Sequence, residues 1–209
     1  MKAPAAPTRP SHGSQPRAER TRASILDEAV AHILEAGLAG ANVKAIAQRA
    51  GVTWGVVQYH FGDREGLLVA VVDKGFEELT TALAVSPSGR SGDVHDRVRD
   101  VVETAWSAMS SPTSRAAIEI LIGTRATPGS AARKQLSRLA STFAELAQSI
   151  TDDLDATQSK AIGDLLLTNI RGLVTTQLIM PRQIDTATER RMLIDVLSTY
   201  IDTTAKPGI

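Results

Sequence analysis

The sequence predicts an all-α protein, and three observations support this. Aromatic residues make up only 3% of the 209 residues. No run alternates Val, Ile or Thr with polar residues, as a half-buried strand would. Ala, Leu, Glu, Arg and Gln instead recur at the spacing of one helical face. The apolar fraction of 43% is ordinary for a globular protein with a sizeable core, so we expect packed helices in one large domain or two small ones.

The composition also excludes several kinds of site and segment. The chain has no cysteine, which rules out disulfides and thiol chemistry. No apolar run approaches the roughly 20 residues of a membrane span, and the N-terminus lacks the apolar core of a signal peptide. We therefore expect a cytoplasmic protein without membrane segments.

The net charge is zero, from 23 basic and 23 acidic residues. A net charge of zero gives little support for nucleic-acid binding. Up to Arg64 the chain has eight basic against five acidic residues, an excess of three positive charges. Binding to nucleic acid would then depend on fixed geometry more than on a large electrostatic field.

The first segment, residues 1–17, is predicted to be a disordered tail, because it is rich in proline and small residues and has no hydrophobic period. Its basic residues either lie along DNA as an arm or only solubilise the chain. A first helix is expected from Thr21 to Ala36, ending at Gly37. His32 is expected to be a partly exposed helix residue, because no second His or Cys stands at ligand spacing.

Two short helices joined by a tight turn are predicted over residues 42–61. The first carries apolar residues at helical spacing behind Asn42 as its N-cap. Gly51 is expected to end it in the left-handed conformation, and Thr53 is the expected N-cap of the second helix. This order of elements is a helix-turn-helix.

The second of these helices has two contrasting faces. At about 100° per residue, Val57 and Phe61 share a face that can dock on a core, while Gly55 and Tyr59 lie near the opposite pole. The outward face offers an amide, a phenol and a glycine that permits close approach, and such groups can meet base edges and phosphates. For this stretch alone, an ordinary surface helix with two apolar anchors is the alternative.

Residues 21–79 resemble the DNA-binding domain of the TetR family, the tetracycline-repressor-like transcription regulators. The residues that carry the resemblance are Ile25, Leu26, Ala29, Gly37, Val43, Ile46, Ala47, Ala50, Gly51, Val52, Thr53, Gly55, Tyr59, His60, Phe61, Arg64, Glu65, Leu67 and Leu68. The sequence departs from the family pattern at Val56, Val57 and Gln58, where the family often has Thr or Ser, Leu or Ile, and Tyr. Two usual hydroxyl contacts therefore lack their donor, while Gln58 offers a bidentate amide.

The resemblance implies nine helices in all and a DNA-binding domain over residues 18–79. Arg64 follows Asp63, a candidate cap of the fourth helix, at a helix N-terminus where a phosphate would be held. The predicted DNA-binding residues are Lys44, Thr53, Trp54, Gly55, Val56, Gln58, Tyr59, His60 and Arg64.

Residues 80–205 are predicted to form a ligand-binding and dimerisation domain. A fourth helix over residues 63–84 carries an apolar stripe longer than the small domain needs, so it should link the two domains. Five more helices are expected at about residues 93–110, 113–126, 130–151, 157–180 and 186–204.

The last two of these helices are expected to form a four-helix homodimer interface with their symmetry mates. Apolar residues wrap most of helix 157–180, and Gly163 and Gly172 would allow close helix approach. The resemblance implies the same interface. A monomeric bundle core is the alternative.

A cavity for a small, largely apolar ligand is implied in the second domain. The expected lining residues are Trp106, Met109, Ile122, Arg125, Phe143, Arg171 and Gln177. Arg125 and Arg171 stand among apolar residues, and each needs an anionic partner. That partner would be an internal carboxylate such as Glu119 or an acidic ligand.

An enzyme is not expected, because the common nucleophile, nucleotide and metalloprotease motifs are missing. We expect no cofactor or metal, and we interpret Asp152–Asp155 as a helix-capping turn, not a calcium loop. The expected function is a sequence-specific DNA-binding transcriptional repressor, a homodimer on a near-palindromic operator that a small-molecule effector releases. The alternative is a helical ligand-binding or interaction module whose helix-turn-helix no longer reads DNA.

Overall fold

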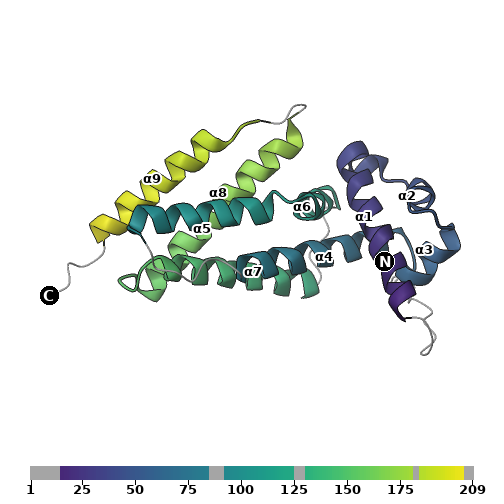
Figure 1. Ribbon diagram of the computed structural model, residues 1–209, viewed down its shortest axis with the longest axis horizontal. Helices are drawn as coiled ribbons and strands as arrows, with labels where there is room; N and C mark the ends of the chain where they lie inside the picture. Colours follow the sequence, from purple (N-terminus) through teal and green to yellow (C-terminus); the bar gives the residue numbers. More distant parts are fainter. Residues whose placement is uncertain (1–14, 85–91, 125–129, 181–183, 205–209) are drawn as a thin grey trace. The chain divides into compact units, whose positions relative to one another are not determined.

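The computed structural model describes residues 15–84, 92–124, 130–180 and 184–204 (Figure 1). Within these ranges the chain forms nine helices and no strand, so the all-α prediction is confirmed. They are α1 Gln15–Gly40, α2 Val43–Arg49, α3 Trp54–Phe61, α4 Arg64–Ala84, α5 Val94–Met109, α6 Pro112–Thr124, α7 Ser130–Ile150, α8 Ala156–Ile179 and α9 Ala187–Thr204. Among the described helices, none is both long and apolar enough to span a membrane.

The chain divides into two compact units, and the division differs from the boundary expected at residues 79–80. The first unit contains residues 1–76 together with 112–125, and the second contains 77–111 and 126–209. The division therefore falls inside α4, and α6 belongs to the N-terminal unit although it follows the expected boundary. Order along the chain does not determine which unit a helix packs in.

Helix α1 is longer than predicted at both ends. It begins at Gln15, so residues 15–17 are helical and do not belong to a disordered tail, while residues 1–14 lie outside the described part of the chain. Gly37 interrupts it at φ 70°, a conformation that favours glycine, and helical structure then continues to Gly40. His32 is half-buried, and its Nε2 has no hydrogen-bond partner among the described residues.

The apolar stripe of α4 is buried along its whole length, as predicted. Its members are Leu67, Leu68, Val71, Val72, Phe76, Leu79 and Leu83. Because the two units meet within this helix, one continuous backbone joins the core of the first unit to that of the second.

The second unit is built around the close packing of α7 and α8. A Cβ at Gly163 would lie 2.6 Å from the Ala144 nitrogen and 2.7 Å from the Phe143 carbonyl oxygen, so only glycine fits there. Gly163 is predicted to serve the dimer interface, but its close contact lies inside the chain. At Gly172, on the same helix, an added Cβ would meet nothing within 4 Å.

The turn before α8 caps that helix, as predicted for Asp152–Asp155. The Asp155 carboxylate accepts hydrogen bonds from the backbone N–H groups of Thr157 and Gln158, both at 2.8 Å. The Gln158 side chain in turn accepts from the Asp155 N–H at 2.9 Å, which completes a capping box.

Candidate nucleic-acid interface

The helix-turn-helix forms as the local signals predict. Asn42 caps α2 by accepting the Lys44 N–H at 2.9 Å, and Gly51 takes φ 66° immediately after the helix. The Val52 N–H donates back to the Ala47 carbonyl at 2.9 Å, which tightens the turn. Helix α3 then begins at Trp54 and contains eight residues.

Helix α3 has one buried and one exposed face. Val57 is fully buried and Phe61 nearly so, as the 100° spacing predicts. Val56 and His60 are half-buried. The other predicted DNA-binding residues on or before this helix are exposed, and so is Lys44 on α2: Thr53, Trp54, Gly55, Gln58 and Tyr59. The structure therefore gathers these residues on the outward side of α2 and α3.

Two details at the start of α3 are not explained by contacts within the chain. Thr53 occupies the N-cap position, but its side chain makes no capping hydrogen bond, contrary to our expectation. A Cβ at Gly55 would meet only the Thr53 Oγ1, at 3.8 Å, so the fold itself does not require a glycine there. Packing within the chain does not explain a glycine at this position, whereas the close approach of an external group to the backbone would.

Arg64, predicted to contact a phosphate, is exposed and also makes two hydrogen bonds within the fold. Its Nη2 donates to the Leu38 carbonyl at 3.1 Å and its Nε to the Ala41 carbonyl at 3.4 Å. Arg64 therefore ties the start of α4 to the end of α1. The expected cap is present, since Asp63 accepts the Gly66 N–H at 2.8 Å.

Other basic residues of the first unit are also used within the fold. Arg49 on α2 forms ion pairs with Glu28 and Glu35 on α1, at 2.8 and 2.5 Å. Arg22 lies over the ring of Phe61, with its guanidinium carbon 5.1 Å from the ring centroid.

The residues predicted to line an effector cavity differ in burial, and none of them lines the groove described below. Met109 and Phe143 are buried core residues, while Ile122 and Arg171 are exposed, and Ile122 belongs to the other unit. Trp106 lies under Arg190, 4.7 Å from ring centroid to guanidinium carbon, and the Gln177 side-chain amide donates to the Ile184 carbonyl. Arg125 lies outside the described residues. Neighbours in sequence point in different directions on a helix, so an apolar sequence context did not predict burial.

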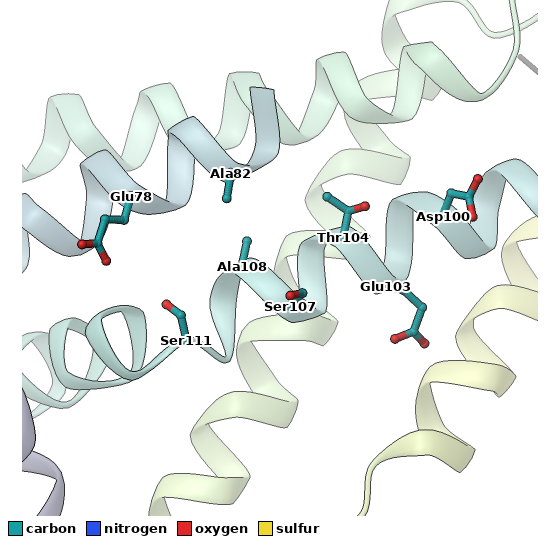
Figure 2. Close-up of a pocket in the computed structure, with 8 residues that line it drawn as sticks. All are labelled: Glu78, Ala82, Asp100, Glu103, Thr104, Ser107, Ala108 and Ser111. Atoms are coloured by element: carbon teal, nitrogen blue, oxygen red, sulfur yellow. The ribbon is translucent and has the colours of Figure 1, made fainter. Parts of the chain in front are cut away.

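A groove of about 560 Å³ instead lies between α4 and α5 in the second unit (Figure 2). Its lining combines three carboxylates, three hydroxyls and two alanines: Glu78, Ala82, Asp100, Glu103, Thr104, Ser107, Ala108 and Ser111. Figure 2 shows the two α4 residues on one side and the α5 residues on the other. Glu103 also accepts from Arg190 Nε at 3.0 Å, so its charge is partly compensated.

The sequence carries a signal for one wall of this groove, which the predicted cavity residues missed. Asp100, Glu103, Thr104 and Ser107 follow the i, i+3, i+4, i+7 spacing of one helical face. A polar face of this kind normally faces only solvent. The approach of α4 turns it into the wall of a groove.

Comparison with known proteins identifies relatives. Residues 25–71 match the family described as bacterial regulatory proteins, tetR family. The HTH-type transcriptional regulator BetI of Burkholderia thailandensis is 37% identical over 84 residues, which are 40% of this chain and 43% of that protein. BetI of Paraburkholderia phytofirmans is 33% identical over 90 residues, 43% of this chain and 46% of that protein. The chain thus matches less than half the length of these curated relatives.

Solved structures share the fold over most of the chain. A TetR transcriptional regulator from Chloroflexus aurantiacus has a TM-score of 0.67 at 20% identity and covers 91% of this chain and 98% of its own. A transcriptional regulator from Rhodococcus has a TM-score of 0.65 at 20% identity, covering 90% and 99%. The multidrug binding protein EbrR, complexed with imidazole, has a TM-score of 0.57 at 21% identity, covering 84% and 93%.

Proposed function

We propose that this chain, whose residues 25–71 match the tetR family of bacterial regulatory proteins, is a sequence-specific DNA-binding transcriptional regulator of that family. It acts as a repressor in the cytoplasm, as a homodimer that leaves its operator when a small molecule binds. The exposed face of α3 carries this proposal, since Gln58 and Tyr59 point outward while Val57 and Phe61 anchor the helix. No cofactor takes part.

The residues of the outward face divide into two roles. The amide of Gln58 and the phenol of Tyr59 suit base edges in the major groove. Lys44, the Thr53 hydroxyl and the backbone around Gly55 suit phosphates, with Trp54, Val56 and His60 completing the contact surface. Arg64, exposed at the first residue of α4, also suits a phosphate, and its hydrogen bond to the Leu38 carbonyl fixes the start of α4.

The alternative is a helical module whose helix-turn-helix no longer reads DNA. One observation favours it: Arg49 and Arg64 are engaged within the fold, and the net charge of the chain is zero. Sequencing the genomic fragments that the purified protein retains separates the two functions. A regulator enriches one near-palindromic motif, and salt weakens its hold on random DNA. A module without DNA binding enriches no fragment at any salt concentration.

The dimer is proposed through α8 and α9. Large apolar side chains are exposed on or directly after these helices of the single chain, and Gly172 has open space around it. The exposed residues are Leu165, Ile179, Met180, Met192, Val196 and Tyr200. Two recognition helices must meet half-sites about 34–36 Å apart, which requires a closed two-fold pair. A monomeric bundle would leave this apolar surface in water.

The effector site is proposed in the groove between α4 and α5. Its volume of about 560 Å³ lies within the roughly 300–1,000 Å³ of small-molecule sites. Three carboxylates and three hydroxyls stand at the edges of a lining whose exposed surface is mainly apolar, which suits a positively charged molecule with an apolar body. EbrR, which shares the fold, is a multidrug binding protein.

Thermal unfolding with a panel of organic cations and matched neutral and anionic compounds tests this site. Cations should raise the unfolding temperature and release the operator. Asp100→Asn should abolish both effects, and Glu145→Gln on the exposed side of α7 should change neither. If only neutral compounds raised the unfolding temperature, the effector would instead be the largely apolar molecule expected from the sequence.

A further inference from the structure

The end of α1 is held from two sides. Gly37 breaks the helical geometry, and the next residue, Leu38, then uses both of its backbone groups outside α1. Its N–H donates to Glu119 Oε1 on α6 at 2.7 Å. Its carbonyl accepts from Arg64 Nη2, at the first residue of α4, at 3.1 Å. One residue of α1 therefore contacts α6 through its donor and α4 through its acceptor.

Helix α6 has little room to move against these partners. A Cβ at Gly123 on α6 would lie 2.5 Å from the Leu38 Cδ2 atom. A Cβ at Gly75 on α4 would lie 2.8 Å from the Ala117 Cβ and 3.1 Å from the Thr113 carbonyl oxygen, both on α6. Since packed helices shift as units and do not deform continuously, a displacement of α6 must also displace Leu38.

We propose that Glu119 is a positioning residue for DNA binding. Glu119 holds the backbone N–H of Leu38, the residue whose carbonyl accepts from Arg64 at the start of α4. Arg64 stands three residues after Phe61, the last residue of α3, so its position sets how α3 meets α4. This inference rests on the proposed DNA-binding function.

Glu119→Ala removes the acceptor and should weaken operator binding about tenfold, the loss expected for one hydrogen bond to a charged group. Glu119→Gln keeps an acceptor oxygen at the same distance and should bind within about twofold of the unaltered chain. Glu145→Ala on α7 makes the same change in charge and serves as the matched control. Hydrogen exchange at the Leu38 amide should accelerate in Glu119→Ala only, a local readout that a general loss of stability would not give.

A double-mutant cycle with Arg64→Ala tests whether Glu119 acts through Arg64. Because both side chains bind backbone groups of Leu38, their effects on operator affinity should be non-additive. Additive losses, or a folded Glu119→Ala chain that binds operator as tightly as the unaltered one, would overturn the proposal. If Glu119→Ala does not fold, Glu119→Asp, which draws the carboxylate back by one methylene, carries the same measurements. An unaltered chain that binds no DNA at all would instead refute the proposed function, and this inference with it.

Discussion

Arg49 on α2 donates two hydrogen bonds to the Glu35 carboxylate on α1, from Nη1 to one oxygen at 2.5 Å and from Nη2 to the other at 3.1 Å. Its Nε donates to Glu28 at 2.8 Å, so one guanidinium joins α2 to two turns of α1. The hydrogen bonds from Arg49 hold the pKa of Glu35 below its ordinary value of 4.5. They also raise the pKa of Arg49 above its usual range, so this side chain stays charged.

The stability of the first unit should therefore fall in acid. A carboxylate whose pKa is lower in the folded state stabilises it above its unfolded pKa, and this contribution is lost as pH falls through the folded pKa. We expect the urea midpoint of the first unit to decrease as the pH is lowered below about 4.5. Glu35→Gln should show a smaller decrease over the same pH range. An identical pH profile for the two proteins would assign the acid sensitivity to other carboxylates.

Gln58→Ala should cost roughly 1–3 kcal/mol of binding to the preferred operator and relax the preference at one base position. The reason is that a bidentate amide contact reads one base, and alanine leaves that base edge unpaired. Competition between the operator and its single-base variants measures both quantities. Equal losses on operator and on random DNA would show that Gln58 does not read sequence.

Lys44→Ala should weaken binding to all DNA sequences alike and lower the slope of log affinity against log salt by about one. Lys44 is exposed beside the N-cap of α2, where an ammonium group can meet a phosphate. A salt titration on operator and on random DNA measures this. A change in base preference would instead place Lys44 in the groove.

Val196→Glu should give monomers in sedimentation and lose binding to the full operator. Val196 is 54% exposed on α9, so the charge should leave the fold of the single chain intact. Val69→Glu on α4 is the matched control, because the same residue type is also 54% exposed there, outside α8 and α9. Monomers that bind the full operator tightly would contradict the α8–α9 dimer.

Gly163→Ala should destabilise the second unit by about 1–3 kcal/mol, as overpacking does, since its Cβ would meet the α7 backbone. Gly172→Ala on the same helix adds the same methyl group where nothing of the single chain lies within 4 Å, and in a monomeric Val196→Glu background it should gain about 1 kcal/mol of helix propensity. Chemical unfolding of both variants measures the difference. A stabilised Gly163→Ala chain would mean that α7 and α8 can separate at no cost.

The helix-turn-helix could be predicted because its signals are local. The side chains of Asn42 and Asp63 cap helices within three residues of themselves, and Gly51 ends α2 where it stands. Likewise the spacing of Val57 and Phe61 alone determines which face of α3 is buried. These features can be predicted without knowing which other helices pack against them.

The roles of Arg64 and Glu119 could not be predicted in the same way. Glu119 binds an amide 81 positions earlier in the chain, and Arg64 binds a carbonyl 26 positions earlier. The groove depends on α4 approaching α5, and the predicted cavity residues do not include its lining, because the direction of a side chain depends on the packing of whole helices. Long-range contacts of this kind are fixed by tertiary packing, which a local pattern does not encode.

The place of α6 in the first unit limits how this protein can be divided and recombined. A gene fusion with one junction after α4 would carry α1 to α4 without the helix that supplies Glu119 and fills the space beside Gly75. Such a chimera would hold α3 on an incomplete support. Transfer of the first unit to another protein therefore needs a junction within α4 and a further junction on each side of α6, so the two units are expected to be inherited together.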